Sequence, residues 1–237
     1  MITSAANPRL KLVRKLASRR QRDKLGLFAC SGEDLVAAGL DAGLRPVEAL
    51  VDAERPVLLE RLPAAELVAP ELLGDLSGLP HPARVVAVFR RADLPAGADR
   101  PTGLALWHVG DPGNVGTLLR TADALGPAFV ALSVGCADPT GPKALRASAG
   151  AVFRVPVARF DEAPRPLVGL VPRGGTPLPE LALGEHVTFV VGAEREGLPE
   201  EVLVRCDATA SIPQEPDAES LNVAVAGALA LYERRRR

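Results

Sequence analysis

Residues 104–126 read LALWHVGDPGNVGTLLRTADALG, and this stretch decides the fold class. Residues 104–109 have the length and apolar character of a fully buried parallel strand. A tight loop follows at 110–113, after which we predict a helix that has Asn114 as its N-cap and ends near Gly126. A buried strand that leads through a tight turn into a helix is typical of open α/β sheets, which bind their ligands at that turn.

The alternation of strands and helices continues toward the C-terminus. Further buried strands are predicted at 129–132, 167–171 and 187–191, with a helix at 143–148. This order predicts a mainly parallel sheet with helices on both faces. The last helix, predicted at 221–232, is nearly all apolar and rich in alanine and glycine. A helix that is apolar on most sides must be buried, either in the core or at a subunit interface.

The N-terminal part of the chain has the pattern of a smaller α/β unit. Asn7-Pro8 is a capping residue followed by proline at the first helical position, and it opens a helix with an apolar stripe. Strands are predicted at 25–30, 47–51, 67–68 and 84–89, and helices at 33–42 and 71–76. Residues 93–101 contain two prolines and a glycine without periodicity, which is typical of a linker. We therefore predict an N-terminal domain at 1–92, a linker at 93–102 and a C-terminal domain at 103–237.

Composition narrows the class of protein. A chain of 237 residues with 47% hydrophobic content can form one large hydrophobic core or two smaller ones, and its length favours two domains. Cys30, Cys136 and Cys206 are odd in number and far apart, so they predict neither a disulfide framework nor a metal site. No basic-then-apolar leader and no apolar run of the roughly 18 residues of a membrane helix is present. We expect a soluble, cytoplasmic protein without a metal or a membrane partner.

The distribution of charge is more informative than its sum. A net charge of −1 argues against a protein that coats nucleic acid by bulk electrostatics. Nevertheless, eight cations opposed only by Asp23 are concentrated near the N-terminus: Arg9, Lys11, Arg14, Lys15, Arg19, Arg20, Arg22 and Lys24. We predict that this cluster contacts RNA, the alternative being a solvated helix face. The four arginines at 234–237 are interpreted instead as a solvent-exposed charged tail, which is favoured at the C-terminus of a helix.

Two polar residues follow the first buried strand. Asn114 is explained by capping alone, but Arg120 stands six residues later in an otherwise apolar helix. Such an arginine is either a surface residue or a group that handles an anion or hydroxyl in a cleft. His108 precedes the loop and is interpreted as a strand-end residue rather than as a general base.

Two further motifs lie later in the chain. The strand at 187–191 ends in a Gly-x-Glu-x-x-Gly pattern, so backbone can approach a ligand at Gly192 beside the carboxylate of Glu194. The simpler interpretation is a turn with a solvated charge. Ser220 could be the N-cap of the last helix. Asn222 would then lie inside an apolar helix, where an unpaired amide costs about 1–3 kcal/mol.

Together these motifs resemble the SpoU/TrmH RNA 2′-O-ribose methyltransferases of the SPOUT superfamily, over almost the whole chain. The resemblance rests on Asp-Pro-Gly-Asn-Val-Gly at 111–116 with Arg120, Ala-Ser-Ala-Gly-Ala at 147–151, Gly-Ala-Glu at 192–194, and Ser-Leu-Asn-Val at 220–223. It implies an N-terminal RNA-binding domain and a C-terminal SPOUT domain with a parallel sheet, a C-terminal trefoil knot and a homodimeric assembly.

The resemblance also implies roles for particular residues. Arg120 would act on the attacking 2′-hydroxyl and Asn114 would orient it, with Glu194, Ser220 and Asn222 completing the network. Gly192, Ile212 and Leu221 would bind the methyl donor S-adenosylmethionine, largely through backbone. A guanidinium hardly ever loses its proton, so we expect Arg120 to bind phosphate or stabilise a developing alkoxide instead of acting as a base.

The same resemblance indicates which RNA is methylated and which other functions have to be considered. The N-terminal domain favours ribosomal RNA over transfer RNA. The chain departs from the family at Gln214 and at 215–217, both in the donor-binding loop. One alternative is a non-catalytic RNA-binding protein that retains the fold. A nicotinamide enzyme is disfavoured, because Gly110, Gly113 and Gly116 do not have the dinucleotide-binding spacing.

Overall fold

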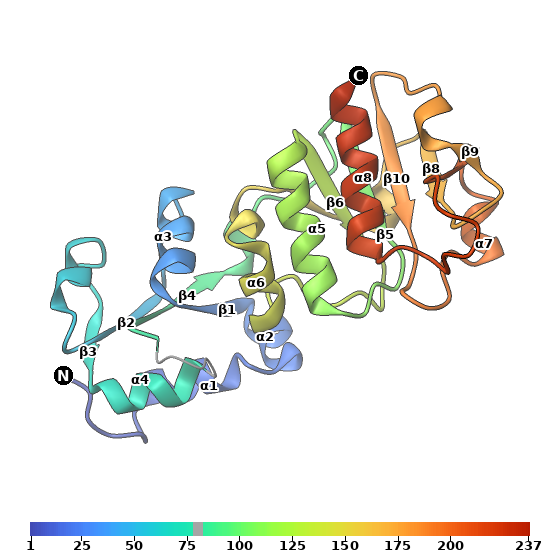
Figure 1. Ribbon diagram of the computed structural model, residues 1–237. Coiled ribbons are helices and arrows are strands. Elements are labelled where there is room, and N and C mark those ends of the chain that lie inside the picture. Colours follow the sequence, from blue (N-terminus) through green and yellow to red (C-terminus); the bar gives the residue numbers. More distant parts are fainter. Residues whose placement is uncertain (78–82) are drawn as a thin grey trace.

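The computed structural model describes residues 1–77 and 83–237, which form two α/β halves packed side by side (Figure 1). Within the described residues, a four-stranded sheet has the order β1-β4-β2-β3 and a seven-stranded sheet has the order β7-β6-β5-β10-β8-β11-β9. The smaller sheet belongs to the N-terminal half and the larger one to the C-terminal half. No helix in these described ranges is long and apolar enough to cross a membrane.

The N-terminal half matches its predicted strands and helices closely. Its elements are α1 (Pro8–Lys15), α2 (Arg19–Leu25), β1 (Leu27–Ser31), α3 (Glu33–Asp41), β2 (Glu48–Asp52), β3 (Glu66–Val68), α4 (Pro70–Ser77) and β4 (Val85–Arg90). Asn7 caps α1 as predicted, since its side chain accepts a hydrogen bond from the Arg9 amide at 2.9 Å. The strand predicted at 25–30 was wrong at its start, because Leu25 ends α2 and Gly26 turns the chain with a φ of 64°.

The C-terminal half has the predicted parallel sheet. Its elements are β5 (Thr102–Leu106), α5 (Pro112–Leu125), β6 (Ala128–Leu132), α6 (Pro142–Ser148), β7 (Val157–Arg159), β8 (Leu167–Leu170), β9 (Thr176–Pro177), β10 (Val187–Val191), α7 (Glu200–Leu203), β11 (Ala208–Ser211) and α8 (Val223–Arg236). Every neighbouring pair of strands in this sheet is parallel. The carboxyl ends of the central strands β5 and β10 therefore lie at one edge.

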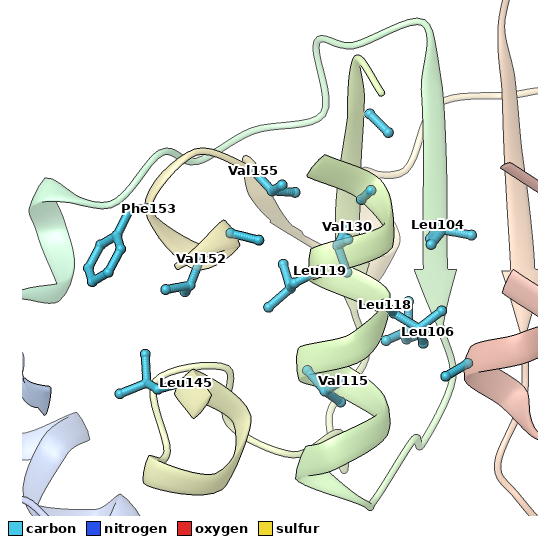
Figure 2. Close-up of a cluster of buried hydrophobic side chains, with 14 of the residues drawn as sticks. Leu104, Leu106, Val115, Leu118, Leu119, Val130, Leu145, Val152, Phe153 and Val155 are labelled. Atoms are coloured by element: carbon cyan, nitrogen blue, oxygen red, sulfur yellow. The ribbon is translucent and has the colours of Figure 1, made fainter. Parts of the chain in front are cut away.

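Helix α5 forms the centre of the C-terminal core (Figure 2). Its apolar residues Leu118, Leu119 and Ala122 are buried, as the spacing of a helix with one core face requires. They pack between the sheet residues Leu104 and Val130 and the segment that follows α6.

The two halves share one hydrophobic core. Phe28 of β1, Phe89 of β4 and Phe153 of the C-terminal half form an aromatic group with ring centroids 5.7 to 6.3 Å apart. Gly39 of α3 fits this group closely, because a Cβ there would lie 3.0 Å from the Phe89 ring. The halves are thus joined by packed apolar side chains as well as by the chain itself. The predicted boundaries at 93–102 stay a prediction, although β5 already begins at Thr102.

Helix α8 is buried on one face and exposed on the other within a single chain, which leaves the predicted alternative of a subunit interface open. Gly227 and Ala230 face the core, and a Cβ on Gly227 would lie 2.4 Å from Leu118. The outer face exposes Val225, Leu229 and Tyr232 at 47%, 38% and 55%. Their spacing of four and three residues makes a continuous apolar stripe along the helix.

Candidate functional site

Two loops meet at the carboxyl edge of the large sheet, because β5 and β10 are parallel neighbours. One loop joins β5 to α5 and the other follows β10. Glu194 from the second loop accepts hydrogen bonds on Oε1 from the Asn114 side-chain amide at 2.9 Å and from the Asp111 backbone amide at 3.2 Å. The predicted pair of Asn114 and Glu194 is therefore in direct contact.

Asp111, not Asn114, caps α5. Its carboxylate accepts hydrogen bonds from the backbone amides of Gly113 and Asn114, and the Lys143 ammonium lies 2.9 Å from it. The Lys143 hydrogen bond holds the pKa of Asp111 below its usual value. Because Asp111 satisfies the helix terminus, the Asn114 side chain is free to contact Glu194.

Asn222 extends the cluster from the start of α8. It is the N-cap of that helix, accepting hydrogen bonds from the amides of Ala224 and Val225. The expectation of Asn222 inside the helix and Ser220 as its cap was wrong, because α8 begins only at Val223. The Asn222 side-chain amide donates to Asn114 Oδ1 at 3.3 Å, so Asn222, Asn114 and Glu194 form one chain of hydrogen bonds.

The cluster keeps Glu194 ionised. Burial alone would raise the pKa of Glu194, but the hydrogen bonds from Asn114 and from backbone amides, including that of Asp111, hold it below its usual value. A carboxylate of this kind accepts hydrogen bonds and is a weak base near neutral pH. The chemical role of Glu194 is therefore to orient hydrogen-bond donors such as the Asn114 amide.

A cavity of about 500 Å³ opens beside Glu194. Its wall includes the three residues predicted to bind a donor, together with two of the predicted catalytic residues: Gly192, Ile212, Leu221, Glu194 and Ser220. At Gly192 a Cβ would lie 2.1 Å from the Gly197 carbonyl group, so only glycine permits this tight return of the loop. Gln214 Oε1, also in the cavity wall, is buried and has no hydrogen-bond partner among the residues that the structure describes.

Arg120 is not brought to this cluster within the chain. It is exposed and lies six residues beyond Asn114 on α5. Six helical residues correspond to about 9 Å of rise and a rotation of about 240°. Within residues 1–77 and 83–237, the Arg120 guanidinium has no hydrogen-bond or ion-pair partner, which leaves it available to an outside group.

Half of the basic N-terminal cluster is engaged within the fold. The prediction that Arg22 contacts RNA was wrong, and so was the alternative of a solvated face, since Arg22 is 4% exposed and pairs with Asp138 at 2.8 Å. Arg9 pairs with Glu48 and Glu66, while Arg14 and Arg19 bind backbone carbonyls. The cations that stay exposed and whose side chains have neither a hydrogen-bond nor an ion-pair partner in the described part of the chain are Lys11, Lys15, Arg20 and Lys24.

Sequence reasoning missed Asp111 and Lys143. Asp111 could have been found, because Pro112 suits the first helical position and so makes Asp111 the N-cap. The strand predicted to reach residue 109 ends at Leu106. His108, which was interpreted as a strand-end residue, therefore lies beyond the strand, with a φ of 52° and its ring stacked on Trp107 at a centroid distance of 4.7 Å. Among the residues that the structure describes, no group of three or more metal-ligating side chains is placed to hold an ion.

Comparisons with known proteins agree with this geometry. The family model of the SpoU rRNA Methylase family matches residues 101–232. The 23S rRNA (guanosine(2553)-2′-O)-methyltransferase RlmP of Bacillus subtilis is 33% identical, over 99% of this chain and 98% of its own. An AdoMet-bound rRNA methyltransferase from Sinorhizobium meliloti has a TM-score of 0.86 at 30% identity, covering 99% of this chain and 97% of its own. The SpoU methyltransferase AviRb from Streptomyces viridochromogenes, in complex with AdoMet, has a TM-score of 0.84 at 28% identity, covering 97% of each chain.

Proposed function

The chain belongs to the SpoU rRNA methylase family, and from this premise we propose that it transfers a methyl group from S-adenosylmethionine to a ribose 2′-hydroxyl of ribosomal RNA in the cytoplasm. The observation that carries the proposal is the hydrogen-bonded chain of Asn222, Asn114 and Glu194 beside the cavity at Gly192. Relatives named as 23S rRNA 2′-O-methyltransferases support the choice of ribosomal over transfer RNA.

The cavity fits the methyl donor. Gly192 leaves a space that a Cβ would fill. Gln214 Oε1 is a buried hydrogen-bond acceptor to which no group of the described residues donates. Gly192, Ile212 and Leu221 would hold S-adenosylmethionine, which supplies an electrophilic methyl group on sulfur. Gln214, where the chain departs from the family, would offer its side-chain oxygen to the bound donor.

The residues of this chain orient the acceptor. Methyl transfer from sulfur is an in-line displacement, so holding the hydroxyl in line supplies much of the acceleration. Asn114 is held by Glu194 on one side and by Asn222 on the other, which fixes the plane of its amide. Arg120 keeps its charge and stabilises the adjacent phosphate or the developing alkoxide, while the proton is lost to water.

The test is methyl incorporation. Tritiated donor is incubated with the protein and separated ribosomal and transfer RNA, and the label is mapped by nuclease digestion. We expect label in ribosomal RNA at an alkali-resistant linkage, because a 2′-O-methyl group blocks alkaline cleavage. If calorimetry shows donor binding but neither RNA is labelled, the non-catalytic alternative holds for these substrates.

We also propose a homodimer. The exposed stripe of Val225, Leu229 and Tyr232 is an apolar surface that a second copy of α8 would cover. Arg120 on the neighbouring helix α5 would then lie near the interface, where it can reach the partner's site. Leu229→Glu should convert the dimer to a monomer in light scattering, because burying an unpaired charge is costly. A wild-type monomer at micromolar concentration with full activity would refute this proposal.

The trefoil knot belongs to the same proposal. A contact between the loop before β9 and the segment that leads to α8 supports it. The Arg173 guanidinium donates to the carbonyls of Pro216 and Ala218 at 2.6 and 2.7 Å.

A further inference from the structure

The segment that joins β6 to the first turn of α6, residues 133–143, contacts the loop between β5 and α5 along its length. We call that loop, residues 107–111, the catalytic loop, and residues 133–143 the bridge segment. Its contacts lie at its start, middle and end: His108 N to Ser133 Oγ at 2.9 Å, Ala137 N to the Val109 carbonyl at 2.9 Å, and Lys143 Nζ to Asp111 at 2.9 Å. These contacts fix residues 108–111, which lead directly to Asn114.

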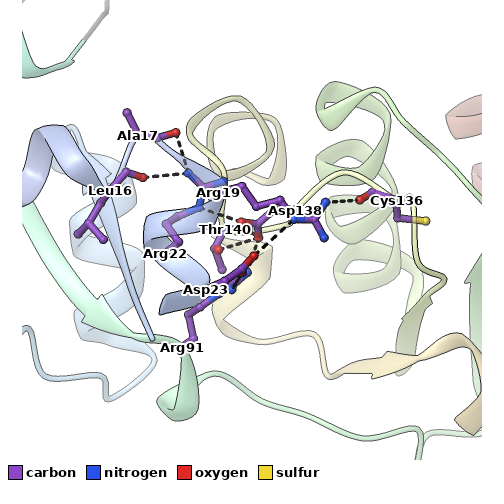
Figure 3. A network of polar contacts seen from close by, with 9 residues as sticks. All are labelled: Leu16, Ala17, Arg19, Arg22, Asp23, Arg91, Cys136, Asp138 and Thr140. Carbon is purple, nitrogen blue, oxygen red and sulfur yellow. Dashed lines mark hydrogen bonds and ion pairs between the residues drawn. The ribbon is translucent and has the colours of Figure 1, made fainter. Parts of the chain in front are cut away.

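The other side of the bridge segment is held by the N-terminal domain (Figure 3). Arg22 Nε donates to Asp138 Oδ2 at 2.8 Å, and Arg91 donates to Oδ1 at 2.6 Å. Arg19 adds a hydrogen bond to the Cys136 carbonyl at 2.9 Å. All three arginines come from outside the C-terminal half.

Asp138 organises several elements of the N-terminal domain at once. Arg22 also donates to the carbonyls of Leu16 and Ala17 at 2.8 and 2.9 Å, where α1 ends, and Arg91 binds Asp23 of α2. The helices α1 and α2, which carry the exposed cations, are thus tied to one carboxylate.

The pair is buried, and both carboxylate oxygens of Asp138 accept hydrogen bonds. The side chains of Arg22 and Asp138 are 5% and 3% exposed. Thr140 supplies two further hydrogen bonds to Asp138 Oδ1, from its amide and its hydroxyl. Apolar contacts such as those of Phe153 hold the two halves together but do not depend on their relative orientation. The hydrogen bonds of a buried charge network are directional, so they favour one orientation of the halves.

We propose that Asp138 is a positioning residue for methyl transfer: through the bridge segment, it fixes the catalytic loop relative to the RNA-binding surface of the N-terminal domain. This inference rests on the proposed function and on the predicted contact of the exposed cations of α1 and α2 with RNA. RNA held there presents its ribose at a set distance and angle, and the first turn of α5, which carries Asn114, must meet it there. Loss of Asp138 should therefore impair chemistry more than binding of either substrate.

The experiment compares Asp138→Asn with wild type. This variant keeps the shape of the side chain but removes the charge that Arg22 and Arg91 bind. We expect kcat to fall by about tenfold or more, as small misplacements near reacting groups do, with the Kd for donor and for RNA nearly unchanged. Asp161→Asn is the matched control, because it removes a carboxylate from an exposed pair with Arg205.

A second variant and a second readout keep the test decisive. Should Asp138→Asn fail to fold, Arg91→Gln serves in its place. It removes the contacts of Arg91 with Asp138 and Asp23 at the 28% exposed rim of the network but leaves Arg22 paired with Asp138, so kcat should still fall. In both variants, amide exchange at His108 and Ala137 should be faster without any RNA. Unchanged kcat and exchange, or a parallel loss of donor affinity, would overturn the inference. Absence of methyl transfer by wild type would instead refute the proposed function, and the exchange rates would still decide the role of Asp138.

Discussion

The sharpest prediction concerns Gly192→Ala, which adds one methyl group to the donor cavity. The added Cβ would lie 2.1 Å from the carbonyl carbon and oxygen of Gly197 and 2.6 Å from the amide nitrogen of Leu198. All three are backbone atoms, so no side-chain rotation can relieve the overlap. The loop between Ala193 and Gly197 must move away from the end of β10.

The size of the effect follows from the cost of overpacking, about 1–3 kcal/mol. If that strain is relieved only by opening the loop, and donor binding must close it again, the Kd for S-adenosylmethionine rises by about 5- to 150-fold, at ~1.4 kcal/mol per tenfold. Calorimetric titration measures this directly. Gly184→Ala is the control, because the nearest atom to its Cβ is 4.0 Å away. A Gly192→Ala variant that binds donor as tightly as wild type would show that this loop does not form the donor site.

Three further predictions concern Arg120 and the cluster around Asn114. Arg120→Ala should abolish transfer but leave donor affinity within a few-fold, because Arg120 lies apart from the cavity; substantial residual turnover would contradict its role. Asn222→Ala should lower the free energy of unfolding by about 1 kcal/mol as a lost helix cap and also lower kcat, whereas the cap-competent Asn222→Ser should restore stability but not activity. In Lys143→Met, the pKa of Asp111 should return toward its usual value. A lowered carboxyl pKa stabilises the fold above the unfolded pKa of about 3.9 and loses that contribution as pH falls through the folded value, so acid unfolding of the variant should begin at higher pH.

Strands and long helices could be predicted because their apolar periodicity is local. The central strand β10 was predicted at 187–191, the bounds that the structure shows. Helix α2 was missed, since Arg19–Leu25 is largely polar and is stabilised by tertiary contacts such as that of Arg22. The short strands β7 and β9 were missed as well, because three and two residues are too few to show a period.

The candidate site could be predicted only through the resemblance to a family. Asn114 and Glu194 are 80 residues apart, and Asn114 and Asn222 are 108 apart. No local pattern brings such residues together; the parallel order of β5 and β10 does. The pairing of Arg22 with Asp138, across 116 residues, had no signal at all, and the basic run around Arg22 favoured a solvated or RNA-facing side chain.

The aromatic group at the junction of the halves limits how this protein can diversify. A fragment that began at residue 103 would leave Phe153 without Phe28 and Phe89, and it would present an apolar flank to water. Conversely, an N-terminal domain taken from a relative would fit only if its counterpart of Gly39 left room for the ring of Phe153. The N-terminal and C-terminal halves are therefore expected to be inherited, and to be engineered, as a single unit.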